Sequence, residues 1–269
     1  MDEVRRRAYL DALGIPLWVP RVRGAAVGLR ADLQNPRGTP ARPAFLPTAD
    51  EATGEVAGRP ATGPATRSGD SAAGLHAAQR IDDSALDWPA LRERVAACTA
   101  CALHATRTQT VFGVGTERAR LMIIGEAPGA DEDRQGEPFV GRAGQLLNAM
   151  LRSIGLERGD VYIANVLKCR PPGNRNPSLE EAAACAGFLR RQIALIAPKL
   201  ILSVGGISAR NLLGTDAPVG KLRGTVHEVG PDRVRCLVTY HPAYLLRQPE
   251  EKAKAWQDLQ LAARLLQES

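Results

Sequence analysis

The chain has 269 residues, of which 44% are hydrophobic, and it carries a net charge of +6 and five cysteines. Its length suits one large domain or two small ones. No apolar run approaches the ~20 residues that a membrane-spanning helix needs, and the first residues lack the apolar core and cleavage site of a secretory signal. Cysteines in such a chain argue against a disulfide framework and favour metal binding in a reducing compartment. We therefore expect a cytoplasmic protein without a membrane partner.

The positive charge lies in one part of the chain. Residues 1–90 contain 11 basic and 11 acidic side chains, whereas residues 91–269 contain 24 basic and 18 acidic ones. A basic folded region suits a polyanionic partner, and nucleic acid is the most common one. A generally arginine-rich composition would give the same balance, so charge alone leaves both interpretations open.

Two segments precede the predicted folded domain. Residues 1–23 have apolar side chains at helical spacing between Val4 and Leu13, and Trp18 follows them. Residues 24–84 are rich in Ala, Gly, Pro and Thr and lack periodicity, which predicts a flexible linker. A tryptophan-containing tip on a long linker indicates a docking peptide for another protein, and a helix packed on the domain is the alternative.

Residues 85–269 show the alternation of strands and helices that predicts an α/β fold. Apolar runs predict strands at 121–125, 161–165, 200–205 and 234–239. Helical patterns predict helices at 143–154, 178–196, 207–213 and 250–267. Such alternation implies a mostly parallel sheet with helices on both faces. Ligands of these sheets bind beyond the carboxyl ends of the strands, where Gly125, Asn165, Gly205 and His241 fall, and we expect one active site there.

Four cysteines have the spacing of a metal site. Cys98 and Cys101 form a C-x2-C pair, and Cys169 and Cys185 follow on different predicted elements. Four thiolates suit zinc or an iron–sulfur cluster. Because zinc ribbons usually combine two close pairs and only one is present, the spacing favours an iron–sulfur cluster without excluding zinc. Cys236, in a predicted strand, is interpreted as a core residue.

The loop after the first predicted strand is acidic. Its carboxylates are Glu126, Asp131, Glu132 and Asp133. Beside a polyanion they would repel phosphate unless some take part in chemistry, and a magnesium site is the alternative. Phe139 follows in the same loop, where it could stack on a flat ligand, although a lone phenylalanine is more often a core residue.

Two further segments have the composition of nucleic-acid contacts. His241 opens a predicted loop in which Leu245, Leu246 and Arg247 suit insertion into a bent duplex, and a helical turn starting at a proline is the alternative. The segment 168–177 places three cations beside Cys169 and could follow a phosphate backbone.

These motifs together resemble the family 4 uracil-DNA glycosylases, the iron–sulfur members of the uracil-DNA glycosylase superfamily. The resemblance covers residues 88–267 and rests on four blocks in order. The blocks are the Cys98/Cys101 pair, GEAPGADEDRQGEPFVGRAGQLL at 125–147, NVLKCRPPGNRNP at 165–177 with Cys185 beyond, and HPAYLLR at 241–247. It implies a three-layer α/β/α sandwich around a four-stranded parallel sheet and a structural [4Fe-4S] cluster on the four cysteines.

The resemblance also implies a reaction. The enzyme would flip uracil out of DNA and hydrolyse its N-glycosidic bond, as a monofunctional glycosylase of base excision repair. Phe139 would stack on the uracil, Asn165 would bind its edge, and the turn from Gly125 to Ala127 would lie against the base and sugar. His241 would donate a hydrogen bond to uracil O2, while Leu245, Leu246 and Arg247 would fill the space left in the DNA.

This chain differs from the best-known members of this superfamily in the group that orients the attacking water. Those members have an Asp where this chain has Ala127. Glu132 is the first candidate for that role and Glu126 the second. A DNA-trapping relative carries a nucleophilic His in an inserted loop near the Asn165 strand, and this chain has none there. We therefore expect turnover rather than covalent capture.

Two other functions remain compatible with the sequence. One is a non-enzymatic iron–sulfur protein that binds DNA as a polymerase accessory, favoured by Ala127 and Trp18. The other is a zinc-stabilised magnesium phosphohydrolase that uses the acids of residues 126–133. The expected protein is a monomeric, nucleoid-associated bacterial enzyme that acts on uracil-containing DNA, with a protein partner docked on residues 1–23.

Overall fold

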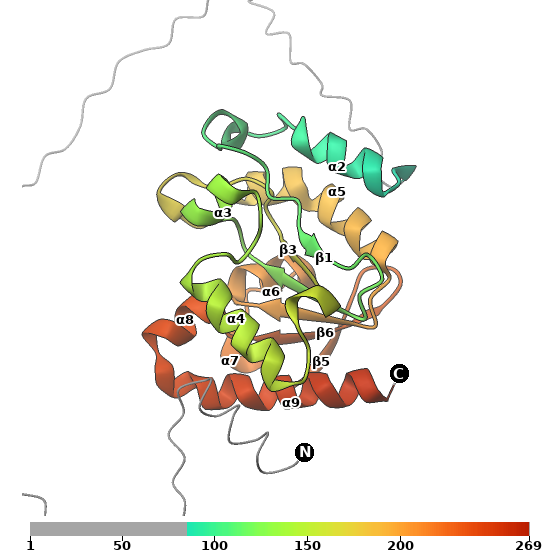
Figure 1. Cartoon of the computed structure of the whole chain (residues 1–269), viewed down its shortest axis with the longest axis vertical. Helices are drawn as coiled ribbons and strands as arrows, with labels where there is room; N and C mark the ends of the chain where they lie inside the picture. The colour runs from blue at the N-terminus through green and yellow to red at the C-terminus, as the bar shows by residue number, and fades with distance from the viewer. Residues whose placement is uncertain (1–84, 269) are drawn as a thin grey trace, which may run out of the picture. The chain divides into compact units, whose positions relative to one another are not determined.

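The computed structural model describes residues 85–268 (Figure 1). The docking peptide predicted at 1–23 and the linker predicted at 24–84 lie outside these residues. None of the described helices combines the length and hydropathy needed to cross a membrane.

The centre of the domain is a six-stranded sheet with the order β1-β3-β2-β4-β6-β5. Its four inner strands are parallel to one another, namely β3 (Tyr162–Asn165), β2 (Leu121–Gly125), β4 (Leu200–Val204) and β6 (Val234–Thr239). They confirm the four predicted strands. Two short antiparallel strands, β1 (Val114–Gly115) and β5 (Val226–Val229), close the edges and were not predicted.

Helices cover both faces of the sheet (Figure 1). The α-helices are α2 (Trp88–Ala96), α3 (Ala130–Gln135), α4 (Arg142–Ser153), α5 (Leu179–Ile196), α6 (Gly206–Leu213), α7 (Val219–Leu222), α8 (Pro242–Arg247) and α9 (Lys252–Gln267). Single 3-10 turns are η2 (Ala102–Ala105), η3 (Arg158–Asp160), η4 (Pro172–Asn174) and η5 (Pro249–Glu251). The four predicted helices correspond to α4, α5, α6 and α9, whereas α3 and α8 lie where loops were expected.

Alternate residues of β2 enter two different cores. Leu121 and Ile123 pack with α4, α8 and α9, whereas Met122 and Ile124 pack with α5. All five residues of β2 are buried, as expected for an inner parallel strand with both faces covered. The arrangement is the predicted three-layer α/β/α sandwich.

Local sequence explains where α5 begins. The Ser178 hydroxyl accepts a hydrogen bond from the Glu181 backbone N–H at 3.1 Å, and the Glu181 carboxylate accepts one from the Ser178 N–H at 2.9 Å. Arg175 pairs with the same carboxylate at 2.6 Å and holds its pKa down at about 2. This capping box fixes the start of the helix that carries Cys185.

Candidate functional site

The carboxyl ends of the inner strands bring the predicted base-binding residues together. Gly125, the last residue of β2, pairs with Asn165, the last residue of β3. A Cβ atom on Gly125 would lie 2.4 Å from Asn165 Oδ1 and 2.7 Å from Phe139 Cζ. Only glycine therefore fits between the amide and the aromatic ring.

Asn165 has an unpaired acceptor in this corner. Its side chain is 2% exposed, and its Oδ1 atom has no hydrogen-bond partner within residues 85–268. A buried amide oxygen without a partner costs about 1–3 kcal/mol. Such an atom, placed at a strand end beside a glycine, is suited to accept a hydrogen bond from a ligand.

Phe139 has a left-handed backbone conformation, and hydrogen bonds to the Glu132 carboxylate hold the loop around it. Phe139 has φ = 56° and a ring that is 6% exposed. Glu132 Oε1 accepts hydrogen bonds from the N–H groups of Val140 at 3.0 Å and Gly141 at 3.2 Å, and Glu132 Oε2 accepts one from Gly129 at 3.1 Å. Both carboxylate oxygens of Glu132 thus bind the backbone on either side of the loop.

This contact pattern changes the ranking of the two candidate catalytic carboxylates. Glu132 has its oxygens occupied by three backbone N–H groups, so its position indicates support of the Phe139 loop rather than contact with water. Glu126 is half-buried, and its carboxylate makes no hydrogen bond or ion pair within the described residues. Burial raises the pKa of Glu126 above its ordinary value.

Ala127 packs against the cysteine-rich cluster formed by Leu103, Leu167, Cys169 and Cys185.

The remaining acids of the loop have separate structural partners. Asp133 is 3% exposed and accepts a hydrogen bond from the Thr108 N–H at 3.0 Å, while Asp131 pairs with Arg134. Within residues 85–268, no three His, Cys, Asp or Glu side chains are arranged to hold a single metal ion. The geometry therefore gives no support to a magnesium site in this loop.

His241 is held in one orientation and one tautomer. It caps α8, and its Nδ1 atom accepts a hydrogen bond from the Ala243 N–H at 3.1 Å. In the neutral ring the proton then lies on Nε2. Burial, with a further contribution from the charge of Arg247, lowers the pKa of His241 to about 4. At neutral pH it is an uncharged donor.

The segment after His241 is the helix α8 rather than the expected loop. Leu245 is 1% exposed and packs in the core with α4 and α9, so its side chain does not lie at the surface, where the predicted DNA contact would need it. Leu246 is 38% exposed and Arg247 is also exposed. The helix turns one leucine inward and the next outward, which leaves Leu246 and Arg247 as the candidates for DNA contact.

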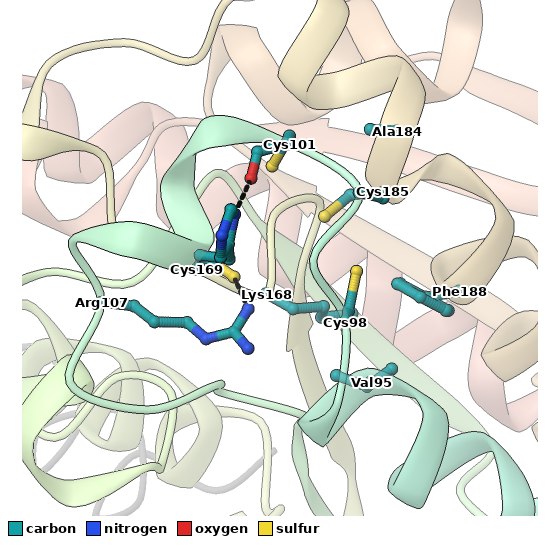
Figure 2. Close-up of a pocket in the computed structure, with 11 residues that line it drawn as sticks. Val95, Cys98, Cys101, Arg107, Lys168, Cys169, Ala184, Cys185 and Phe188 are labelled. Atoms are coloured by element: carbon teal, nitrogen blue, oxygen red, sulfur yellow. Dashed lines mark hydrogen bonds between the residues drawn. The ribbon is translucent and has the colours of Figure 1, made fainter. Parts of the chain in front are cut away.

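The four predicted metal ligands line one pocket between α2, η2 and α5 (Figure 2). Cys98, Cys169 and Cys185 are buried, Cys101 is half-buried, and all four are free thiols. Figure 2 shows their sulfur atoms turned toward a common space. Burial raises the pKa of Cys185 to about 12, so deprotonation there needs a cation to offset the charge.

The donor set of this pocket fits an iron–sulfur cluster. Four soft thiolates suit zinc or a cluster. Arg107 Nη1 donates to Cys169 Sγ at 3.1 Å, and hydrogen bonds to cysteine sulfur are one way in which proteins tune such clusters.

Comparison with known proteins identifies the family. The family model of the uracil DNA glycosylase superfamily matches residues 112–260. The chain belongs to this superfamily. It is 47% identical over 162 residues to a type-4 uracil-DNA glycosylase of Archaeoglobus fulgidus, an alignment that covers 58% of this chain and 81% of the relative. The residues matched by the family model include Gly125, Asn165 and His241.

Two further relatives agree with the resemblance to family 4. The type-4 uracil-DNA glycosylase of Thermotoga maritima is 48% identical over 157 residues, with coverage of 58% of this chain and 81% of the relative. The type-4 enzyme of Pyrobaculum aerophilum is 43% identical over 180 residues, with coverage of 65% and 92%. These matches confirm the assignment to family 4 made from the motifs.

Sequence reasoning missed one buried residue of this glycosylase domain. Lys168, expected to follow a phosphate backbone, is 1% exposed and lines the cysteine pocket. The other two cations of its segment are engaged locally, Arg170 with Asn174 and Arg175 with Glu181. The available signal was the position of Lys168 between a strand-end asparagine and a metal-ligand cysteine.

Proposed function

We propose that this chain is a type-4 uracil-DNA glycosylase that hydrolyses the N-glycosidic bond of deoxyuridine in DNA and leaves an abasic site for base excision repair. The observation that carries this proposal is the buried, unpaired Oδ1 atom of Asn165 beside Gly125 and Phe139. The named activity of the type-4 relatives supports it.

Asn165 provides the specificity for uracil. The base must leave the duplex, because its glycosidic bond cannot be reached inside the stack. Asn165 Oδ1 then accepts a hydrogen bond from uracil N3–H, and the amide N–H donates to uracil O4. Cytosine presents the opposite pattern at these atoms, so the same amide rejects it. Phe139 supplies an apolar face for the base.

His241 stabilises the leaving group. As the glycosidic bond breaks, negative charge develops on the uracil ring and its O2 oxygen. The neutral imidazole donates from Nε2 because Nδ1 is committed to the Ala243 N–H. A donor that is oriented before the reaction lowers the barrier in the same way as an oxyanion hole, and removal of one such donor typically costs about 10²–10³ in rate.

Glu126 is assigned the activation of water. Its carboxylate is half-buried, has a raised pKa and has no protein partner within the described residues. It directly follows Gly125, which places it at the same strand end as the base-binding corner. Glu132 is assigned the positioning of the Phe139 loop.

The four cysteines are assigned to a structural [4Fe-4S] cluster. Bound there, the cluster would join α5, the η2 region and the segment after β3 through bonds to Cys98, Cys101, Cys169 and Cys185. Its contribution is to hold these segments together, and the hydrolysis itself uses the side chains of the base-binding corner. DNA contacts are assigned to Leu246 and Arg247. The monomeric state and a protein partner on residues 1–23 are further parts of the proposal.

The substitution Asn165→Ala tests the proposal. Uracil release from a single-uracil oligonucleotide should fall by about 10² or more, while binding to an undamaged oligonucleotide should stay within about twofold, because Asn165 is buried and cannot reach the backbone of stacked DNA. Unchanged uracil release would overturn the role of Asn165. Absence of release by the unsubstituted chain, with DNA binding intact, would instead favour a DNA-binding accessory protein.

A further inference from the structure

Lys168 contacts both the base-binding corner and the cysteine pocket. Its ammonium group donates to the backbone oxygen of Asn165 at 2.9 Å and to Gln192 Oε1 at 2.6 Å. The same side chain lines the pocket of the four cysteines (Figure 2). One side chain therefore joins the residue that reads the base to the site assigned to the cluster.

The buried charge of Lys168 requires a nearby negative charge. The residue is 1% exposed, and a buried ion without a partner of opposite charge costs several kcal/mol. The acceptors of its ammonium group within residues 85–268 are neutral oxygens. The pocket that its side chain lines also contains Cys169 and Cys185, which would carry negative charge as thiolate ligands of the cluster assigned there. A bound cluster would therefore supply the charge that favours a lysine in this position.

Gln192 gives Lys168 a second rigid connection. Its side-chain amide is fully buried and donates to the Phe112 backbone oxygen at 2.9 Å and the Tyr162 hydroxyl at 3.3 Å. It lies on α5, the helix that also carries Cys185. The ammonium group is therefore held between α5 and the end of β3.

The segment that Lys168 supports lies directly against the base-binding corner. The N–H groups of Val166 and Leu167 donate to the backbone oxygens of Gly125 and Glu126, each at 3.0 Å. Lys168 holds the backbone oxygen of Asn165, the residue that directly precedes Val166. Displacement of a recognition group by about 1 Å can cost about 10² in rate.

We propose that Lys168 is a positioning residue that couples the cysteine pocket to base recognition, because its side chain lines that pocket and its ammonium group holds the backbone oxygen of Asn165. This inference rests on the proposed function and deepens it. Lys168 itself touches neither the uracil nor the attacking water.

The test compares Lys168→Met with Arg107→Met in the full chain. Arg107 is a matched control, because it also places a cation on Cys169 but makes its other hydrogen bond to the Ala96 backbone oxygen at 3.2 Å, away from Asn165. Three quantities are measured, namely the visible absorbance of the cluster, its midpoint potential, and kcat and KM for a single-uracil oligonucleotide.

Both variants should shift the midpoint potential to more negative values, because each removes a positive charge beside the cluster. Lys168→Met should also lower kcat by about 10–10², with a smaller change in KM. The loss of kcat in Arg107→Met should be at least about tenfold smaller. A cluster-loaded Lys168→Met protein with unchanged kcat would overturn the inference, and so would equal losses of kcat in the two variants.

A second variant applies if Lys168→Met takes up no cluster. Gln192→Met keeps Lys168 and all four cysteines but removes one acceptor of the ammonium group, and kcat should fall by about tenfold with the cluster retained. Unchanged kcat in this variant would overturn the coupling.

Failure of the proposed function can be distinguished from failure of the Lys168 coupling, because the unsubstituted chain would then release no uracil. The coupling would then be measured as amide hydrogen exchange at Val166 and Leu167. Exchange should be faster in Lys168→Met than in Arg107→Met, and equal rates would contradict the inference.

Discussion

The ring of Phe139 stacks on the imidazole of His241, with centroids 5.5 Å apart and planes inclined by 30°. The two residues come from opposite sides of the sheet centre, one from the loop after β2 and the other from the end of β6. Each is oriented by backbone hydrogen bonds, through Glu132 for the Phe139 loop and through Ala243 for His241. The base-binding corner is thus organised before DNA arrives, as electrostatic catalysis requires.

The two glutamates of the acidic loop should differ sharply on conversion to glutamine. Glu126→Gln should lower kcat by about 10²–10⁴ with little change in thermal stability, because it removes the assigned base. Glu132→Gln should retain kcat within about tenfold but lower stability by about 1–3 kcal/mol, because its amide N–H would face the Gly129 N–H. Single-turnover kinetics and thermal unfolding of both variants check this assignment. The reverse pattern would restore Glu132 as the catalytic carboxylate.

The pKa of His241 predicts a loss of stability in mild acid. Its pKa is about 4 in the folded chain and about 6.5 in an unfolded one. Between these values the unfolded state binds a proton that the folded state excludes, so stability decreases as pH falls from about 6.5 to 4. The contribution is at most about 3 kcal/mol. Chemical unfolding at pH 7.5 and pH 5 should show a larger loss for the unsubstituted chain than for His241→Gln, and equal losses would argue against a lowered pKa.

Gly125→Ala should damage the base-binding corner. The added Cβ would lie 2.4 Å from Asn165 Oδ1, inside the closest normal contact, so the amide or the Phe139 ring must move. We expect a loss of kcat/KM of about 10² for uracil release. Gly159→Ala is the matched control, because its Cβ would meet no atom within 4 Å. Comparable activity of the two variants would show that uracil release tolerates displacement of the Asn165 amide or the Phe139 ring.

Cys185→Ser should prevent stable assembly of the iron–sulfur cluster. Cys236→Ser is the control, because Cys236 lies in β6 within the core that packs on α5 and does not line the cysteine pocket. Visible absorbance and iron content should be lost in the first variant and retained in the second. Retained absorbance in Cys185→Ser would remove Cys185 from the ligand set, and bound zinc without iron in the unsubstituted chain would contradict a cluster.

The inner sheet was predictable because its strands are buried on both faces. Each reads mainly as an apolar run, interrupted in β6 by Arg235, and the observed β2 and β6 begin and end at the predicted residues. The edge strands were not predictable in the same way. β1 has two residues, and β5 is largely exposed and contains His227 and Glu228, so neither carries a distinct hydrophobic pattern.

The roles of neighbouring identical residues could not be read from their order. Leu245 and Leu246 are adjacent leucines, and only the direction in which α8 packs buries the first and exposes the second. Glu126 and Glu132 share one acidic loop, and only the backbone conformation around Phe139 brings three N–H groups to Glu132. Such distinctions depend on tertiary contacts rather than on local pattern.

The most direct test of the account is uracil release from a single-uracil oligonucleotide by the purified full chain, in the presence of EDTA and followed by alkaline cleavage of the abasic site. Cleavage at the uracil position, and none at a cytosine in the same context, is the predicted result. An intact oligonucleotide after incubation with cluster-loaded protein would contradict the assignment of this site to uracil excision.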